Sequence, residues 1–287
     1  MDRATPFGLS PERWKIIQQL RLLDNILMQT VLDQFIPGVE LILRIIMDKP
    51  ELRVTELFVE KLLPNLSARN LRLDVLATDG DQKLCNIEVQ RSDGGAQPKR
   101  PRYHSALMDV QFLKPGMDPE QLPETYVIFI TENDVLAQGL PLYHIDRFVT
   151  ETGALFRDQA HILYANAAYT GDGAFGRLMH DFRESDPDKM YYSILADRVR
   201  AVKSNQKGVM EMSKVMDELY QEGFGQGFGQ GFGQGFGQGT ASVLAQMMQF
   251  NHWSLDHAMR VANLPPEKKS LYEAQIQKLG SEPAPPL

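Results

Sequence analysis

The chain has 287 residues, of which 43% are hydrophobic and 23% are charged, and these are the proportions of a globular protein with a substantial core. Its formal net charge of −7 argues against a protein that coats nucleic acid indiscriminately, although it is compatible with a local basic surface. No stretch supplies the roughly 18 uncharged apolar residues that a membrane helix needs, so we expect no membrane partner.

The N-terminal segment and the cysteine content bear on location. The segment MDRATPFGLSPERW lacks the basic-then-apolar pattern of a signal peptide. The only cysteine, Cys85, cannot form an internal disulfide, which suits a reducing cytosol. We therefore expect a cytoplasmic protein in which Cys85 is a small buried group on a strand.

The first 60 residues predict helices followed by a strand. Ser10-Pro11 is a typical helix start, and the apolar spacing after it predicts one helix that runs to about Phe35. Pro37-Gly38 is expected to break that helix. Residues 39–47 then predict a second helix, and residues 54–59 a strand.

The next two segments predict a β-hairpin. Residues 70–78 and 83–90 alternate as strands do, and Asp79-Gly80-Asp81 between them is a hairpin signal. A loop at residues 80–82 places Asp74 directly opposite Glu88, where Cβ atoms are about 4.5–5.5 Å apart. A slip of one residue would separate the two acids, so their proximity depends on this register.

The elements that follow indicate an α/β domain over residues 1–222. We expect a helix at 103–113, strands at 126–131, 142–149 and 160–166, and helices at 175–183, 190–203 and 209–221. Strands interspersed with helices in this proportion are typical of an α/β core.

Residues 223–238 repeat Gly-Phe-Gly-Gln four times. Glycine costs about 0.8–1 kcal/mol relative to alanine in a helix, so we favour a flexible linker over residues 223–239. In the alternative, the phenylalanines at spacing four form an apolar stripe on a helix that serves assembly.

Residues 240–280 predict a small helical module, and residues 281–287 a disordered tail. The segment from Ser254 to Pro266 has the rhythm of a helix-turn-helix, but its two prolines are atypical of the turn and few cations follow. We favour dimerisation or partner binding over DNA binding. A homodimer through the repeat and these helices is one arrangement open to the chain.

The hairpin carries the chemistry of interest. Hydrolysis of a phosphodiester needs a metal that neutralises developing charge and activates water, and Mg²⁺ usually takes one or two protein carboxylates. Asp74 and Glu88 would supply them, and acids in otherwise apolar strands favour a metal site over a solvated surface. Gln90 shares a strand face with Glu88, where it would orient water or hold a phosphate oxygen.

These residues match a known signature. Asp74, thirteen intervening residues and Glu88-Val89-Gln90 resemble the Asp…(Asp/Glu)-x-Lys pattern of the PD-(D/E)XK nuclease superfamily, with glutamine in place of lysine. The wider stretch LRLDVLATDGDQKLCNIEVQRSDGGAQPKRPRYHSALMDVQFL is similar to the Rpn family of recombination-promoting nucleases, also called PD-(D/E)XK nuclease family transposases. The segment YVIFITENDVLAQGLPLY and the glycine-rich repeats are also similar, so the resemblance covers about residues 20–240. It implies a restriction-endonuclease-like α/β core, with a mixed sheet flanked by helices.

The resemblance also implies ligands and roles. Asp74 and Glu88 would bind Mg²⁺, or Mn²⁺, with the main-chain carbonyl of Val89 as a further ligand. Gln90 would take the place of the family's lysine, which leaves water activation to one or two metal ions. Leu73 stands where the signature has proline, a departure of little consequence.

Glu40, on the predicted helix at 39–47, is a candidate for a further catalytic acid. Superfamily members often place an acidic residue from the preceding helix at the metal site. The alternative is a surface glutamate near a helix N-terminus, where the macrodipole favours it. Asp24 is a weaker candidate for the same role.

A basic segment follows the second hairpin strand and contains a single acid, Asp93. Its location favours contact with nucleic-acid phosphates, which position the nucleic acid without reading its sequence; the alternative is a solvated loop. The candidate nucleic-acid-binding residues are Arg91, Lys99, Arg100, Arg102 and Tyr103.

Other chemistries find less support. The six histidines show no metal-ligand or catalytic spacing, and no nucleophile elbow indicates Ser/His/Asp catalysis. The Gly-Phe-Gly-Gln run lacks the ending of a phosphate-binding glycine loop, so we expect no such loop. The leading hypothesis is a magnesium-dependent DNA endonuclease linked to recombination or mobile elements. The alternative is a nuclease-fold protein of weak or no activity that binds nucleic acid or assembles.

Overall fold

The computed structural model describes residues 6–63 and 71–217, and residues 240–281 apart from 242, 246, 247, 249–253, 263 and 265. The chain divides into two compact units, Met1–Met216 and Asp217–Leu287. The predictions for the repeat at 223–239 and for the tail after Ser281 lie outside the described residues.

The first unit contains a mixed sheet, which in the described residues has six strands in the order β1-β2-β3-β4-β6-β5. Strand β3 is parallel to β4 and β4 is parallel to β6, whereas the other neighbours are antiparallel. All of β3 is buried, as expected of a strand with both faces covered. The strands are β1 (Val54–Leu63), β2 (Leu71–Asp79), β3 (Leu84–Gln90), β4 (Thr125–Thr131), β5 (Leu142–Ile145) and β6 (Ala160–Asn166).

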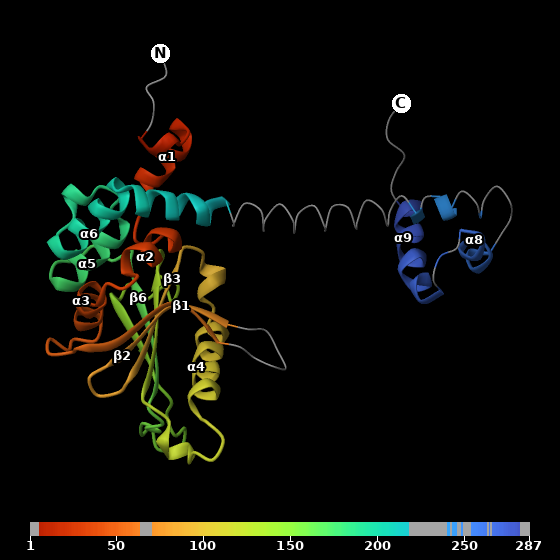
Figure 1. Ribbon diagram of the computed structural model, residues 1–287. Coiled ribbons are helices and arrows are strands. Elements are labelled where there is room, and N and C mark those ends of the chain that lie inside the picture. Colours follow the sequence, from red (N-terminus) through yellow and green to blue (C-terminus); the bar gives the residue numbers. More distant parts are fainter. Residues whose placement is uncertain are drawn as a thin grey trace. The chain divides into compact units, whose positions relative to one another are not determined.

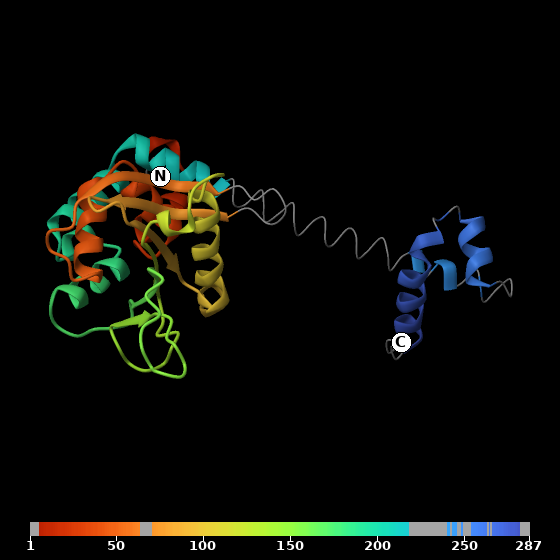
Figure 2. The ribbon, with the colours of Figure 1, turned by 90° about the horizontal axis from the view of Figure 1, so that it is seen from below.

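Helices cover both faces of this sheet (Figure 1). One face packs against α2 (Asn25–Leu32), α3 (Ile36–Ile46), α5 (Ala174–Arg183) and α6 (Ser193–Ser204). The other face packs against α4 (Lys99–Phe112), and the view in Figure 2 again separates α4 from the N-terminal helices. The predicted α/β fold with a mixed sheet flanked by helices is confirmed.

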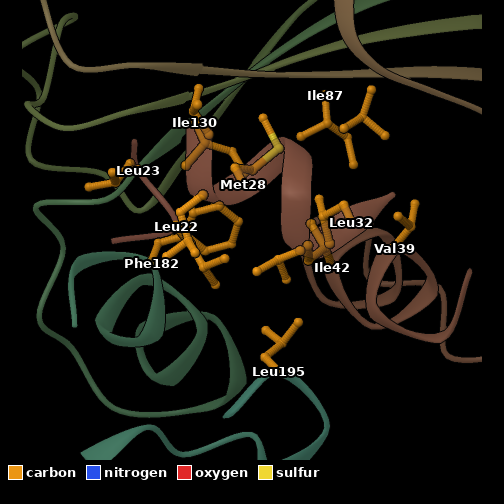
Figure 3. Packing of buried hydrophobic residues seen from close by; sticks show 14 of the residues in the cluster. Leu22, Leu23, Met28, Leu32, Val39, Ile42, Ile87, Ile130, Phe182 and Leu195 are labelled. Carbon is orange, nitrogen blue, oxygen red and sulfur yellow. The ribbon is translucent and has the colours of Figure 1, made fainter. Parts of the chain in front are cut away.

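Side chains from distant parts of the chain meet in the larger core. Figure 3 shows Met28 of α2, Ile42 of α3, Phe182 of α5 and Leu195 of α6 gathered below Ile87 of the sheet. Cys85, Ile87 and Val89 point into this core from β3. Because side chains alternate along a strand, Asn86, Glu88 and Gln90 project from the opposite face, toward α4.

Among the described residues, no single helix is long and apolar enough to cross a membrane. The helices α2 and α3 meet that requirement only as a pair, across a bend of 115°.

The predicted helix from Ser10 to Phe35 is wrong, because the structure has two helices there, α1 (Pro11–Gln19) and α2. Ser10 caps α1 through its side chain, as expected. The break follows because Lys203 Nζ donates to the carbonyls of Gln18 and Leu20, at 2.9 and 2.6 Å. Asp24 Oδ2 then accepts a bond from the Arg21 N–H and closes the turn.

Three other element boundaries also differ from the prediction. Pro37-Gly38 lies in the first turn of α3, a position that suits proline, and does not separate two helices. Strand β5 ends at Ile145 because the chain then forms a side loop closed by the Phe148–Leu155 bridge. Helix α4 begins at Lys99, so Arg100, Arg102 and Tyr103 are helical.

The second unit is helical where it is described. It contains α8 (Leu255–Val261) and α9 (Lys269–Ser281), and a small core that includes Leu255, Met259 and Tyr272. Ser254 caps α8 by accepting a bond from the His257 N–H. The role of this unit and the domain limits stay predictions.

We predict that Lys203→Met lowers the free energy of unfolding by about 2–4 kcal/mol, because removal of a charged donor leaves buried carbonyls unsatisfied. Lys203 is buried and donates to the carbonyls of Gln18, Leu20 and Ser185. Urea unfolding measures the change. Lys207→Met at an exposed position is the matched control, and equal losses in both variants would contradict this account.

Candidate metal and nucleic-acid site

The β2–β3 register brings the two candidate acids together. It pairs Val75 with Ile87 and Thr78 with Leu84, as the hairpin prediction requires. The last paired residues of this ladder are Val75 and Ile87, next to Asp74 and Glu88. From there on, side-chain carboxylates accept the bonds of the main-chain N–H groups. The Asp74 N–H donates to Glu88 Oε1 at 3.0 Å, and the Val89 N–H donates to Asp74 Oδ2 at 3.3 Å. The two carboxyl groups therefore meet where the strands separate.

Both acids are buried, with 7% of Asp74 and 1% of Glu88 exposed. Burial raises the pKa of Asp74 to about 6, against the opposing bonds from the Val89 N–H and Gln29. Burial and the charge of Asp74 raise the pKa of Glu88 well above its ordinary value. In the described part of the chain, no lysine or arginine forms an ion pair with either acid, so the pair resists double ionisation.

Three neighbours of the pair were not predicted. Gln29 of α2 donates to Asp74 Oδ1 at 3.2 Å. His104 of α4 lies with Nδ1 3.1 Å from Asn86 Nδ2 and 3.6 Å from Glu88 Oε1. Burial lowers the pKa of His104 to about 4, so its ring is neutral at neutral pH. Asn86 is two residues before Glu88, so strand alternation could have indicated it, whereas Gln29 and His104 carry no local signal.

The Gln90 side chain is held from the side of α4. Its Oε1 accepts a bond from Arg100 Nη1 at 3.1 Å. The 3-10 turn at Asp93–Ala96 crosses it closely, since a Cβ on Gly95 would lie 2.2 Å from that oxygen. Glycine at this point therefore allows Gln90 to occupy its place.

The main chain of β3 turns the Val89 carbonyl toward the pair. The Gln90 carbonyl accepts a bond from the Glu132 N–H at 2.9 Å, which places it on the β4 side of the strand. Neighbouring peptide groups in a strand point to opposite sides. The Val89 carbonyl therefore points to the β2 side, where Asp74 lies.

The residues present fit a hard divalent cation. Two carboxylates and a carbonyl offer oxygen donors, the set preferred by Mg²⁺ and Mn²⁺. A cation there would offset the repulsion between the two buried acids. Across the described residues, no group of three or more His, Cys, Asp or Glu side chains could hold a metal. Water or substrate would have to complete the coordination of Mg²⁺, as is usual for that ion.

The structure does not bring Glu40 to the pair. Glu40 binds the Val54 N–H at 2.9 Å and the Arg44 guanidinium at 2.6 Å. Val54 pairs with Asp79, five residues along β2 from Asp74, or roughly 17 Å at about 3.4 Å per residue. Glu40 thus joins α3 to the start of β1 at the far end of the strand.

Asp24, the weaker candidate, lies in an ion-pair network beside the sheet edge. Its Oδ1 is 2.6 Å from Arg91 Nη1, and Arg91 Nε is 3.1 Å from Glu132 Oε2. Arg21 completes the network through Glu132 at 2.9 Å. These contacts engage Arg91 with two acids.

The other candidate nucleic-acid-binding residues lie on the first turns of α4. Lys99, Arg100 and Arg102 are exposed, and Tyr103 is partly exposed. Arg100 connects this group to the pair through Gln90. The structure thus separates Arg91 from a helical group of three cations and one aromatic ring.

Residues 39–168 match the family model described as PD-(D/E)XK nuclease family transposase. This region of the chain is similar to that nuclease family. The match confirms the resemblance inferred from the sequence, over a narrower range than expected, and it contains Asp74, Glu88 and Gln90. No curated protein and no solved structure gives a significant match.

We predict that the metal-free first unit loses stability as pH rises through about 6. The folded-state pKa of Asp74 is raised from 3.8 to about 6, so the folded protein keeps a proton that the unfolded chain releases. The stabilisation is full below about pH 4. Its loss by pH 8 is on the order of 2–3 kcal/mol, at 1.36 kcal/mol per pKa unit.

Glu88→Gln keeps the oxygen that accepts the Asp74 N–H but removes a charge, so we expect it to flatten this decline. It should also raise the melting temperature in EDTA at pH 8, and Mg²⁺ should stabilise the wild type more than the variant. Thermal unfolding from pH 5 to 8 measures both effects, with exposed Glu56→Gln as control. Identical pH profiles for wild type and Glu88→Gln would refute the assignment.

Proposed function

We propose that this domain is a Mg²⁺-dependent endonuclease that hydrolyses phosphodiester bonds in DNA, with Asp74 and Glu88 as its metal ligands. The observation that carries the proposal is the buried carboxyl pair at the end of the β2–β3 ladder, inside the region that matches the nuclease family. A protein gains nothing in stability from two adjoining buried acids without a cationic partner. A role in binding a cation accounts for them.

In this proposal the chain holds the cation and orients the substrate. When bound, Mg²⁺ would neutralise charge on the phosphate and make water more acidic. Asp74, Glu88 and the Val89 carbonyl would hold it, and Gln29 fixes the orientation of the Asp74 carboxylate. Mn²⁺ would fit the same oxygen ligands.

Gln90 would position the substrate rather than move a proton. Its amide has no basic atom at neutral pH. Arg100 already donates to its oxygen, so the amide NH₂ is the part that would donate to a phosphate oxygen or to water. Gln90 and Arg100 then act as one unit at the edge of the pair.

The cations of α4 would hold the DNA backbone. Lys99, Arg100 and Arg102 lie in the first turn of α4, and Arg100 contacts Gln90. Contacts to phosphate position nucleic acid without reading sequence. Arg91 and Tyr103 are secondary members of this proposed surface, because Arg91 is already engaged by Asp24 and Glu132.

The wider setting belongs to the same proposal. The family description supports a role in recombination or mobile-element movement and is compatible with an Rpn-type nuclease. We propose a cytoplasmic location, supported by a single cysteine that lies buried on β3. We also propose that residues 1–222 form the nuclease domain, and that the repeat and the C-terminal module serve as linker and dimerisation or partner-binding element.

One observation favours a second candidate function. Gln90 stands where the nuclease signature has its lysine, so this position itself carries no positive charge. The alternative is therefore a nuclease-fold protein with weak or no activity, which binds nucleic acid or assembles.

A plasmid-nicking assay separates the two. We expect the full chain to nick supercoiled DNA with Mg²⁺ and to be inactive in EDTA. Asp74→Asn and Glu88→Gln should lower the rate at least about 100-fold, the usual effect of removing a group that stabilises transition-state charge. Glu56→Gln, an exposed carboxylate on β1, should cut at the wild-type rate. DNA binding without any wild-type cutting would favour the alternative.

We further predict that Gln90→Ala and Arg100→Ala have non-additive effects on nicking. Each should lower the rate roughly 10-fold or more, and the double variant should lose little beyond either single variant, because groups that act as a unit fail together. Single-turnover nicking rates measure the cycle, with Lys114→Ala in the loop after α4 as control. Fully additive losses would show that Gln90 and Arg100 act independently and would contradict this prediction.

A further inference from the structure

One hollow in the first unit, distinct from the Asp74–Glu88 pair, is lined by cationic side chains. It has a volume of about 250 Å³ and lies beside α5. Arg177, His180 and Arg183 line it at a spacing of three residues, so they share one side of the helix. Tyr191 closes it from the segment before α6, and the loop around Gly171 and Asp172 forms the opposite wall.

The two arginines are not neutralised within the described residues. Arg177 lies over the Tyr191 ring at 5.7 Å, and Arg183 Nε donates to the Met179 carbonyl at 3.4 Å. In the same part of the chain, Arg21, Arg91, Arg147 and Arg200 all form ion pairs with carboxylates.

The acids nearest the hollow offset this charge only in part. Asp181 is fully buried and accepts the N–H groups of Tyr191 and Tyr192, at 2.7 and 2.8 Å. It also lies 3.3 Å from His180 Nδ1. Asp172 is exposed on the rim, and no ion pair joins it to either arginine in the described structure. The hollow therefore has a net positive lining.

The wall opposite the arginines is main chain laid directly on α5. A Cβ on Gly176 would lie 1.7 Å from the Gly171 carbonyl oxygen, and a Cβ on Gly171 would lie 2.1 Å from Tyr169 Oη. Glycine is therefore required at position 176, where the clash is with backbone, whereas at position 171 the clash is with the end of the Tyr169 side chain. The run Gly171-Asp172-Gly173-Ala174-Phe175-Gly176 follows β6 and opens α5.

The loop that forms this wall starts at the C-terminal end of β6. The C-terminal end of the parallel strand β3, which carries Glu88 and Gln90, lies at the same end of the sheet. The parallel register places Gln90 beside Thr131 and Thr131 beside Asn166. Asn166 thus lies two strands from Gln90, roughly 10 Å at about 4.8 Å per strand. Residues 167–172 then run from this end of the sheet to the hollow.

We propose that the hollow beside α5 binds a backbone phosphate of the nucleic acid held at the Asp74–Glu88 pair. Guanidinium groups match phosphate oxygens in paired hydrogen bonds, and the Tyr191 hydroxyl adds a donor at the exposed rim. This inference rests on the proposed function for its ligand. It gives the nucleic acid a second anchor, on the face of the sheet opposite α4.

Binding of a duplex by the full chain tests this directly. The parent is Glu88→Gln, which is expected to bind without cutting. The probe is a fluorescein-labelled 30-base-pair DNA, and fluorescence anisotropy at several NaCl concentrations gives Kd. We expect Arg177→Gln with Arg183→Gln to raise Kd roughly 5–10-fold and to lower the salt slope by about 1, the loss of one phosphate contact.

The matched control removes the same charge elsewhere in the first unit. Lys189→Gln with Arg200→Gln changes two exposed cations that already pair with acids, and it should leave Kd and salt slope unchanged. Because both hollow arginines lie at the surface or partly so, the variant should keep the parent's urea midpoint. Unchanged binding in the hollow variant, or equal losses in the control, would overturn the inference.

Two further arms fix the ligand and separate this inference from the proposed function. Inorganic phosphate and a mononucleotide test free ligands: if they saturate the hollow while duplex binding ignores it, the backbone assignment fails. An arginine-dependent duplex affinity in a chain that nicks no plasmid would refute the nuclease and support the phosphate site. A wild-type chain that nicks plasmid, together with a duplex affinity unchanged by the two arginine substitutions, would support the nuclease and refute the phosphate site. Absence of any duplex binding would overturn the inference.

Discussion

At the end of the β2–β3 ladder, carboxylate side chains replace main-chain carbonyls as the acceptors of hydrogen bonds, and the geometry of the candidate site depends on this replacement. The Glu88 carboxylate accepts the Asp74 N–H, and the Asp74 carboxylate accepts the Val89 N–H. Each acid thus completes the other strand's hydrogen bonding just where the strands part. Backbone N–H groups therefore hold both carboxylates in place, and the Gln29 side chain adds a further bond to Asp74.

Two other buried charged side chains of the first unit, Lys203 and Asp181, are fully bonded to main-chain groups. Lys203 is surrounded by three carbonyl acceptors, and Asp181 by two backbone N–H groups. Both are satisfied within the fold and join segments distant in sequence. The acid pair has donors too, but in the described residues no lysine or arginine forms an ion pair with it, and the Arg100 charge opposes its raised pKa values without outweighing burial. That difference is the main support for the proposal that the pair binds a cation.

Sequence reasoning succeeded where local rules decide the outcome. Turn chemistry and strand alternation were enough to predict the hairpin register, and with it the contact between Asp74 and Glu88. The sequence-based predictions are wrong or incomplete where a residue distant in sequence determines a helix end or a contact with the acid pair. The helix break at Leu20 depends on Lys203, and Gln29 and His104 reach the pair from helices whose placement no local pattern reveals. Glu40 was a reasonable candidate by element, but α3 delivers it to the other end of β2.

The ion-pair network of Arg21, Asp24, Arg91 and Glu132 ties the turn before α2 to the ends of β3 and β4. The helix behind that turn carries Gln29, which steadies Asp74. All of this N-terminal segment precedes residue 39, where the family match begins. The segment that matches the family therefore does not contain all of the contacts that hold Asp74 in this chain, because Gln29 and the helix that carries it lie before residue 39 and would be lost from an excised fragment.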